Sequence, residues 1–584
     1  MRKFPVRLLI LVSVVCLLGA GGSGFALRNE ASLSKSPSRD FDCKQNKASR
    51  SDDHFRMRWW GEPTSLNPLS IESAGTEEIR FYVLEGLVSR NERTQEYQPW
   101  LAKSWSQTPD GKEITFEIRD DAFFSDGAPV TARDVKFSFD VLFDERFHTA
   151  AVRGPYEGFS KAEIVGERSV KFVAKERRFT NFEQIAGLPV LPQHIYGNPD
   201  RRNSLERTLV GSGPYVLERW WEGRSLTLKR NERWWGRSHA MFEKKFQPKR
   251  VSYLFASEDT FALELLQKGE LDFMYLSPEL YARLASDKKE CRKNFEAKRI
   301  RNLYPQGIYT IILNLKNPIF ADPATRQALS RLVDRDLMAK RFFRGFFAPA
   351  AGPWYKQSRY AAPETLQASF NPQEALKQLN AAGWKDTDRD GLLDRVINGQ
   401  KVPLSFTILT STRDSSRFLT LLQEDARQVG VEVNLKTLPG VSMQSLLTSG
   451  EFEAVENYAA EGLIDFDPFV VWHSSSTPPQ GANYGRYANA ETDALLEKSR
   501  QELDPAKREL ILREVYRKIS AEHAQIFLFN QIEMAYAVSK RVGRPADTLE
   551  YDIGQRFWWI KNSGEMQAKA RDEGRATASV SKSN

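Results

Sequence analysis

The chain has 584 residues, too many for a single hydrophobic core, and at roughly 100–200 residues per domain this length predicts three or four folded units. With 41% hydrophobic and 11% aromatic residues it can fill sizeable cores, which excludes global disorder. The formal charge of +8 is mild for this length. Basic residues are interleaved with acidic ones, as in Glu502 to Glu514, so no nucleic-acid-binding stripe is expected.

The first residues have the layout of a secretory signal peptide, which we place at residues 1–26. Met1 to Arg7 is short and basic, Leu8 to Leu18 is an apolar run too short to span a bilayer, and Gly24-Phe25-Ala26 is a small-residue cleavage site. No other stretch approaches the roughly 18 consecutive apolar residues of a membrane helix. We therefore expect a periplasmic protein that does not span the membrane once its leader is removed.

The cysteines bear on anchoring and on disulfide formation. Cys16 follows Val14-Val15 instead of the Leu-Ala-Gly type of sequence found in lipoproteins, so lipid anchoring is disfavoured. Removing the leader leaves Cys291 and Cys43, the latter in a polar segment, 27–54, that we expect to be mobile. An oxidising periplasm would permit a bridge between them, but sequence does not show proximity, so a disulfide and two unpaired thiols both stay open.

The stretch Leu101 to Leu142 predicts a hairpin arm followed by a capped helix. Pro109-Asp110-Gly111 has the composition of a tight turn. Thr131 precedes Asp134 by three residues, the spacing of a capping box, so a helix should begin at Ala132. Between turn and helix, three apolar residues alternate with polar ones at the period of a half-buried strand: Ile114, Phe116 and Ile118.

Further along, strands alternate with helices, as expected of α/β units. Three helix starts combine a capping side chain with a proline at the first helical position: Asp322-Pro323, Asn371-Pro372 and Asp504-Pro505. Three apolar runs predict strands: Ile308 to Leu315, Leu404 to Ile408 and Val431 to Leu435. A helical pattern extends from Leu495 to Ile519, with a break at Asp504 left open.

Several blocks of residues carry a family resemblance. Two signature blocks lie at Trp105 to Arg119 and Phe124 to Val135. Further blocks follow in the same order as in the family: Glu62 to Pro68, Gly211 to Tyr215, Arg230 to Gly236, Asp322 to Asp334 and Asn483 to Leu496. With these blocks the chain closely resembles, over about Phe55 to Ile560, the family 5 extracellular solute-binding proteins, which are peptide, oligopeptide and nickel receptors of ABC importers.

The resemblance implies an α/β fold class, a large bilobal periplasmic-binding-protein fold (type II, cluster C-like) with an extra inserted lobe. The implied division is a discontinuous first lobe at 55–74, 211–300 and 525–560, an inserted lobe at 75–210, and a second large lobe at 301–524. Gly211-Ser212-Gly213-Pro214 fits a crossover between lobes because glycines absorb backbone rotation, and a plain surface turn is the alternative. Residues 564–584 are small, charged and aperiodic, and we expect a disordered tail.

The sequence lacks the motifs of catalysis. Its six histidines are scattered, and none stands in a metal-binding helix spacing: His54, His148, His194, His239, His473 and His523. There is no nucleophile elbow, phosphate loop or dinucleotide fingerprint, so we predict neither an enzyme nor a cofactor or metal. Asp386 to Gly391 matches the start of a calcium loop, but position 12 is Ile397 and not glutamate, which favours a structural turn.

Candidate ligand contacts also come from the resemblance. In peptide receptors of this family, an Asp-x-x-Asp-Pro element carries an aspartate that pairs with the α-ammonium of the ligand. Here Asp465-Phe466-Asp467-Pro468 is one residue shorter, and Asp467-Pro468 is typical of a helix cap. Asp465 is therefore the predicted amine partner, with a solvated turn residue as the alternative.

Other candidates are aromatic or lie next to aromatic residues. Trp59, Trp60 and Glu62 resemble the first strand of the family and its exit into the cleft, and Trp472 and His473 resemble an element at the cleft edge of the second lobe. Such receptors hold peptides extended through main-chain hydrogen bonds, with roomy wet pockets for side chains. Core packing is the alternative for the aromatic residues.

The implied function is that of a monomeric periplasmic receptor. It would close on a peptide by hinge rotation and deliver it to the permease subunits of an ABC importer. A receptor of the same fold for a nickel chelate, haem or oligosaccharide is the second hypothesis, and a periplasmic enzyme or chaperone-like interaction protein is the third. The sparse histidines argue against a direct metal site.

Overall fold

The computed structural model describes residues 52–70, 74–286, 294–362, 364, 368–411, 413–459 and 464–561. The predictions on the signal peptide, on Cys43 and Cys291, on all but the end of segment 27–54, and on the tail 564–584 lie outside these residues. Within them, no helix combines the length and the hydropathy needed to cross a membrane.

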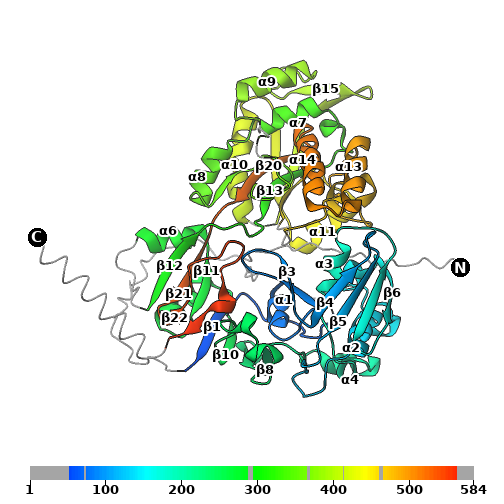
Figure 1. The fold of residues 1–584 in the computed structure, drawn as a ribbon. Helices are drawn as coiled ribbons and strands as arrows, with labels where there is room; N and C mark the ends of the chain where they lie inside the picture. The colour runs from blue at the N-terminus through cyan, green and yellow to red at the C-terminus, as the bar shows by residue number, and fades with distance from the viewer. Residues whose placement is uncertain are drawn as a thin grey trace, which may run out of the picture.

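Three sheets organise the described chain, and the first of them has seven strands (Figure 1, lower left). Its order is β12-β21-β11-β1-β10-β9-β8. The central strand β1 pairs in parallel with β10 and β11, and the remaining pairs are antiparallel. The strands are β1 (His54–Trp59), β8 (Tyr215–Trp221), β9 (Ser225–Arg230), β10 (Arg250–Phe255), β11 (Phe273–Leu276), β12 (Phe295–Ile300) and β21 (Met534–Ser539).

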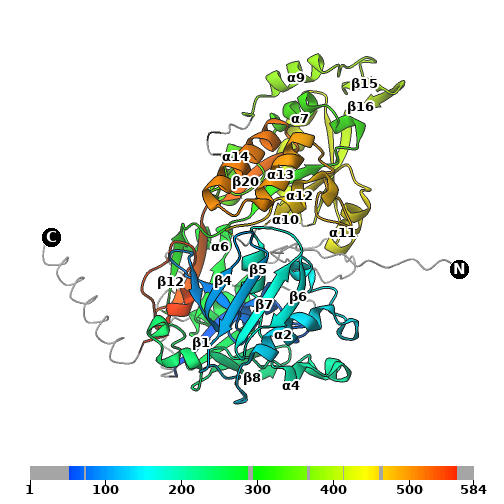
Figure 2. The same cartoon turned by 45° about the vertical axis from the view of Figure 1, so that its right-hand side comes forward.

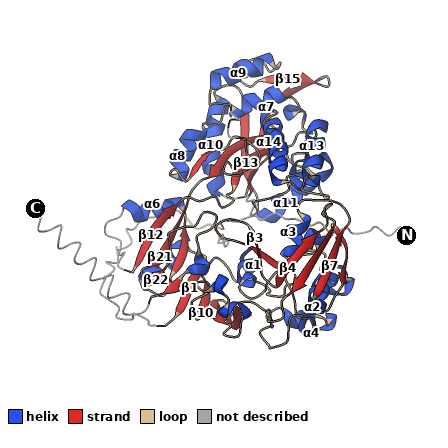
Figure 3. Cartoon of the chain, viewed as in Figure 1, coloured by secondary structure: helices blue, strands red, loops and turns tan. Residues whose placement is uncertain are grey.

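The second sheet has the order β14-β20-β13-β19-β17-β18 and lies above the first in Figure 1. Figure 3 shows helices on both of its sides. The strands are β13 (Ile308–Leu313), β14 (Phe347–Pro349), β17 (Ser405–Thr410), β18 (Glu432–Thr437), β19 (Ala454–Ala459) and β20 (Gln525–Gln531). The main helices are α7 (Pro323–Ser330), α8 (Arg335–Phe343), α10 (Arg413–Arg427), α13 (Ala490–Gln501) and α14 (Pro505–Ala521).

One predicted boundary is wrong. The sequence analysis assigned the chain from residue 525 onward to the first lobe, but β20 pairs with β13 and β14 in the second sheet. The chain changes sheets later, between Gln531 and Met534. β20 and β21 are both apolar and are separated by two residues. The sequence therefore does not indicate at which point the chain passes from the second sheet to the first.

The small sheet is antiparallel, with the order β4-β5-β7-β6 (Figure 2). Its strands are β4 (Ala102–Gln107), β5 (Glu113–Ile118), β6 (Phe159–Ile164) and β7 (Ser169–Ala174), and α2 (Ala132–Asp140) packs against it. The predicted hairpin and strand are confirmed, since β4 pairs with β5 and alternate residues of β5 are buried. The capping box is confirmed as well, because Thr131 and Asp134 exchange both of its hydrogen bonds.

Shorter elements complete the fold. Three strand pairs are β2 (Val88–Arg90) with β3 (Tyr97–Pro99), β15 (Asp394–Ile397) with β16 (Gln400–Pro403), and β22 (Val542–Gly543) with β23 (Trp559–Ile560). The other helices are α1 (Ala74–Phe81), α3 (Asn181–Ala186), α4 (Gln193–Tyr196), α5 (Asp259–Gln267), α6 (Pro278–Ser286), α9 (Pro372–Ala381), α11 (Gly440–Ser449) and α12 (Phe469–Trp472).

Two short segments of the described chain cross between the first and second sheets. One joins β12 to β13, from Ile300 to Ile308, and the other joins β20 to β21, from Gln531 to Met534. The segments are tied together where they leave the first sheet, because Glu533 pairs with Arg299 and lies 3.1 Å from Arg301. Relative motion of the two sheets would therefore concentrate in these two segments.

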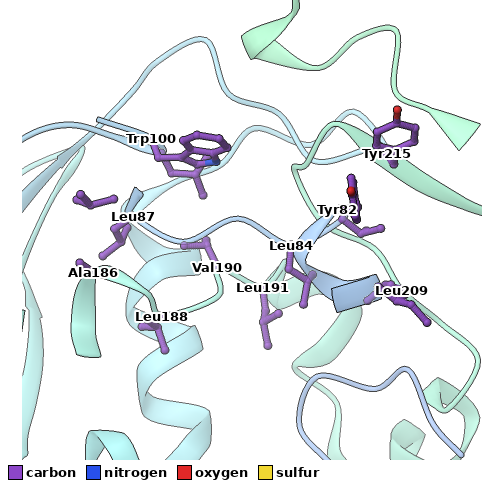
Figure 4. Packing of buried hydrophobic residues seen from close by; sticks show 14 of the residues in the cluster. Tyr82, Leu84, Leu87, Trp100, Ala186, Leu188, Val190, Leu191, Leu209 and Tyr215 are labelled. Carbon is purple, nitrogen blue, oxygen red and sulfur yellow. The ribbon is translucent and has the colours of Figure 1, made fainter. Parts of the chain in front are cut away.

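The small sheet is joined to the first sheet by a shared hydrophobic core, part of which is drawn in Figure 4. The backbone of Gly211 to Gly213 runs directly against Val83, and the Gly213 N–H donates to the Val83 carbonyl at 2.9 Å. A Cβ at Gly211 would lie 2.1 Å from that oxygen, so glycine is needed for close approach. This run is a packed junction and not an exposed turn.

Candidate ligand-binding region

The chain around the small sheet touches the helices of the second sheet directly. The Phe179 N–H donates to the Arg500 carbonyl at 2.8 Å, and Arg177 Nε donates to the Gln501 carbonyl at 2.7 Å. The Arg508 guanidinium lies 4.2 Å from the centre of the Phe179 ring. This contact lies apart from the crossing segments, beside which α6 also packs on the second sheet, with the Tyr281 and Phe346 rings 5.6 Å apart in a shared hydrophobic core.

Asp465 lies at the same junction. Its carboxylate accepts a hydrogen bond from the Tyr360 hydroxyl at 2.6 Å and lies 3.2 Å from both Arg90 and Arg359. Arg508 approaches to 3.9 Å. Burial raises the pKa of Asp465, but the Tyr360 hydroxyl and the three guanidiniums outweigh it, so the pKa lies below its usual value.

Arg90, at the end of β2, comes to Asp465 from the other side of the junction. It also donates to both oxygens of Glu183, at 2.9 and 2.8 Å, and to the Tyr97 hydroxyl at 2.8 Å. Around Asp465, three guanidiniums therefore lie close to two carboxylates, those of Asp465 and Glu183. A ligand ammonium at Asp465 would compete with these arginines, and the predicted role of Asp465 as amine partner stays a prediction.

The two predicted tryptophans differ in burial. Trp59, the last residue of β1, is 9% exposed and packs edge-on against Tyr253 with ring centres 5.1 Å apart, so it belongs to the core. Trp60 is 37% exposed and lies nearly parallel to Tyr275, at 6.3 Å and 8°. Of the pair, Trp60 is the more exposed, and the Arg58 guanidinium lies 5.2 Å from the centre of its ring.

Both carboxylate oxygens of Glu62 accept hydrogen bonds from within the protein. One carboxylate oxygen accepts from Trp220 Nε1 at 2.5 Å, and the other accepts from the Gly223 N–H at 2.8 Å. These bonds hold the turn between β8 and β9 against the segment that follows β1. The carboxylate thus supports the rim of the first sheet.

Trp472 and His473 are both buried in the second half of the molecule. Trp472 is 4% exposed and packs among core residues that include Tyr487 and Phe527. The His473 ring stacks on Phe469 at 4.0 Å, and its Nδ1 lies 2.7 Å from the Ser475 hydroxyl. These contacts match the core-packing alternative.

The aspartate-rich turn makes hydrogen bonds within itself, and the carboxylates of Asp386, Asp388 and Asp390 lie within 4.8 Å of one another. Asp386 accepts from the Gly391 N–H at 3.1 Å, Asp390 accepts from the Leu392 N–H at 2.8 Å, and Asp388 pairs with Lys401. All three carboxylates are exposed. Their contacts are those of a turn leading into β15.

Sequence reasoning missed Glu78, on α1. Its neighbour Glu77 pairs with Arg80 one turn later, at 3.2 Å. Glu78 is half-buried, and in the described part of the chain no hydrogen bond or ion pair engages its carboxylate. Burial, reinforced by the charge of Asp552, raises its pKa to about 7. No local pattern distinguishes Glu78 from Glu77, because the surrounding residues come from distant parts of the sequence.

Comparisons with known proteins agree with this geometry. A family model described as bacterial extracellular solute-binding proteins, family 5 Middle, matches residues 96–481. Protein XP55 of Streptomyces lividans is 28% identical over 492 residues, covering 82% of this chain and 84% of the relative. The oligopeptide-binding protein AppA of Bacillus subtilis is 26% identical over 517 residues, covering 86% and 90%.

Two solved structures share the fold. AppA from Bacillus subtilis in complex with a nonapeptide superimposes with a TM-score of 0.68 at 24% identity, covering 87% of this chain and 99% of that chain. NikA from Brucella suis in complex with Fe(III)-EDTA gives a TM-score of 0.72 at 21% identity, covering 87% and 100%. The predicted α/β bilobal binding-protein fold is therefore confirmed. The chain belongs to the bacterial extracellular solute-binding proteins, family 5.

Proposed function

We propose that this protein is the periplasmic substrate-binding protein of an ABC importer, and that it captures peptides between its two large lobes and delivers them to a membrane permease. Family membership, together with the two short segments through which the described chain crosses between the first and second sheets, carries the proposal. Its relative AppA is an oligopeptide-binding protein and has been solved with a nonapeptide.

The crossing segments support a hinge. A ligand that contacts both lobes stabilises the closed arrangement over the open one by its differential affinity for the two. The contact of Arg177 and Phe179 with residues 500–501 supplies a closing surface that is held by hydrogen bonds to backbone carbonyls. Such a surface suits a reversible contact.

A receptor for a metal chelate is the second candidate, and the fold shared with NikA in complex with Fe(III)-EDTA favours a chelate over haem or an oligosaccharide as the ligand. Native mass spectrometry of the purified protein discriminates between the peptide and the chelate receptor. A mixture of copurifying short peptides supports the peptide receptor, and a single metal complex supports the chelate receptor.

Closure is tested separately by small-angle scattering. The radius of gyration should fall when a pool of short peptides is added to ligand-free protein. A radius that stays constant with every peptide pool and every chelate tried would contradict capture by closure.

A further inference from the structure

The turn between β8 and β9 presents an aromatic ring to solvent. Trp221 is 51% exposed, and all four residues of the turn, 221–224, are exposed. Trp220 stands opposite Leu226, which is fully buried. Because successive side chains of a strand point to opposite faces, Trp221 points away from the core. A single exposed apolar side chain is ordinary on a protein surface, so its neighbours decide whether it has a role.

Two arginines flank this ring. The guanidinium of Arg224 lies 4.5 Å from the centre of the Trp221 ring, and that of Arg219 lies 5.5 Å from it. Neither guanidinium makes a hydrogen bond or an ion pair with any residue that the structure describes. A guanidinium that lies over a ring keeps its N–H groups available. Both arginines can therefore still bind an anion from outside the protein.

The acids around the hairpin have other partners. Glu222 pairs with Arg207 at 2.9 Å. Glu218 accepts hydrogen bonds from Arg250 at 2.7 and 2.8 Å. Glu62 accepts from the hairpin itself, as described above. The end of the hairpin therefore carries two positive charges that these carboxylates do not neutralise.

The end of the hairpin is also held in place. Trp220 Nε1 and the Gly223 N–H donate to Glu62 at 2.5 and 2.8 Å. The Arg224 carbonyl accepts from the Phe255 N–H, at the end of β10, at 3.0 Å. These bonds fix the backbone that carries the exposed ring and its two cations, so less conformational freedom is lost when a partner binds.

The size and the chemistry of this surface favour a lipid headgroup layer as its partner. A stable protein interface buries about 800 Å² on each side, whereas the exposed ring and both free guanidiniums belong to the end of one hairpin. At a membrane surface, tryptophan lies at the level of the headgroups, and guanidiniums pair with phosphates. In Figures 1 and 2, β8 lies at the lower end of the molecule, away from the second sheet.

We propose that Trp221, Arg219 and Arg224 form a surface that binds the anionic headgroups of a phospholipid membrane. The binding is weak and reversible, because it depends on two charges and one ring. This inference goes beyond the proposed function, since it concerns where the receptor resides and not what it captures. It holds equally for a peptide receptor and for a chelate receptor.

The test is flotation of the full chain with vesicles of equal parts phosphatidylglycerol and phosphatidylcholine, or of phosphatidylcholine alone, at about 50 mM salt. The wild type should associate with the anionic vesicles and not with the neutral ones. Arg219→Gln and Arg224→Gln should each lower the partition coefficient about fivefold. Trp221→Ala should lower it as well, and raising the salt to about 0.5 M should abolish association.

The matched control is Arg133→Gln. Arg133, on α2, is exposed and likewise makes no side-chain hydrogen bond or ion pair within the described chain, so this variant removes the same charge from another surface. It should keep the partition coefficient of the wild type within about twofold. Equal losses in Arg133→Gln and in the hairpin variants would show that only net charge matters and would overturn the proposal.

Three other results decide the case. Vesicles that carry bromine in their acyl chains should quench tryptophan emission of the wild type more than that of Trp221→Phe, and equal quenching overturns the proposed role of Trp221. Equal association of the wild type with both vesicle types overturns the lipid surface. Binding of deca-glutamate that requires Arg219 and Arg224, without vesicle association, assigns the surface to an acidic protein segment and overturns the proposal.

Discussion

Glu85 shows how one buried carboxylate joins two parts of the molecule. It is 3% exposed. One oxygen accepts from Trp100 Nε1 and Trp234 Nε1, both at 2.8 Å, and the other accepts from Trp235 Nε1 at 3.1 Å. Burial raises its pKa from 4.5 to about 7, although the indole donors oppose the change. The indoles come from either side of the junction between the small and first sheets.

This raised pKa predicts a pH dependence of stability. Between about pH 4.5 and about pH 7 the folded protein keeps a proton on Glu85 that the unfolded chain has lost, so the stabilisation present below that window is lost as the pH rises through it. The loss amounts to about 3 kcal/mol. Glu85→Gln cannot ionise, so its free energy of unfolding should fall less over the same range.

Urea unfolding at a series of pH values measures this effect. The comparison of wild type with Glu85→Gln isolates this residue from Glu78 and Asp552, which titrate in the same direction. Glu167→Gln, on an exposed turn, should keep the slope of the wild type. Parallel slopes for wild type and Glu85→Gln would contradict a buried, proton-binding Glu85.

At the scale of single residues, local signals were predictable and distant partners were not. The Thr131 cap and the cap-and-proline starts at Asp322, Asn371 and Asp504 depend on neighbours within a few positions, and all are confirmed. The charge of Glu78 raises the pKa of Tyr253 on β10 and of Tyr275 on β11, which lie far along the chain. The same holds for Arg90, whose partner Asp465 is 375 positions away.

At the scale of elements, strand and helix types were predictable because their apolar periods are local. The three predicted strands correspond to β13, β17 and β18, and the helical pattern from Leu495 to Ile519 does break before Pro505. Sheet membership is different, since it depends on long-range pairing. β20 and β21 have similar apolar sequences, yet they lie in different sheets.

The ion pair between Arg90, at the end of β2, and Asp465, in the segment after β19, should influence closure. Arg90 and Asp465 are both largely buried. Arg90 also donates to Glu183, and Asp465 also accepts a hydrogen bond from the Tyr360 hydroxyl. Replacing Arg90 by alanine leaves Glu183 without its guanidinium and removes one contact across the junction. We expect ligand-free Arg90→Ala to populate a more open arrangement, with a coupling to Asp465→Ala of about 1–2 kcal/mol.

Spin labels on exposed positions, Glu157 near the small sheet and Leu510 on α14, report this opening as a longer interlabel distance. Arg146→Ala is the matched control, because Arg146 pairs with Asp144, and among the described residues no hydrogen bond or ion pair joins it to the second sheet. If Arg90→Ala and Arg146→Ala give the same distance distribution, the Arg90–Asp465 pair has no part in closure.

At the scale of the whole molecule, the crossing segments and the contact at Phe179 hold the second sheet in different ways. The crossing segments are covalent and short, whereas the contact at Phe179 and Arg500 consists of hydrogen bonds and a cation–π contact. Polar contacts of this kind are weak in water and reversible. Opening should therefore separate the second contact while the crossing segments bend.

A crosslink across the reversible contact should remove this motion. The Phe179 N–H donates to the Arg500 carbonyl at 2.8 Å, so the two backbones are in direct contact, and a disulfide needs Cα atoms about 4.4–6.8 Å apart. In a background with Cys43 and Cys291 replaced by serine, the oxidised double variant Phe179→Cys, Arg500→Cys should keep one radius of gyration with and without a peptide pool. The reduced form should contract on peptide addition, as should single Phe179→Cys, which cannot form the bridge. An oxidised form that still changes its radius as much as the reduced one would show that the ligand-dependent motion does not separate this contact, and the hinge would then have to lie elsewhere than in the two crossing segments.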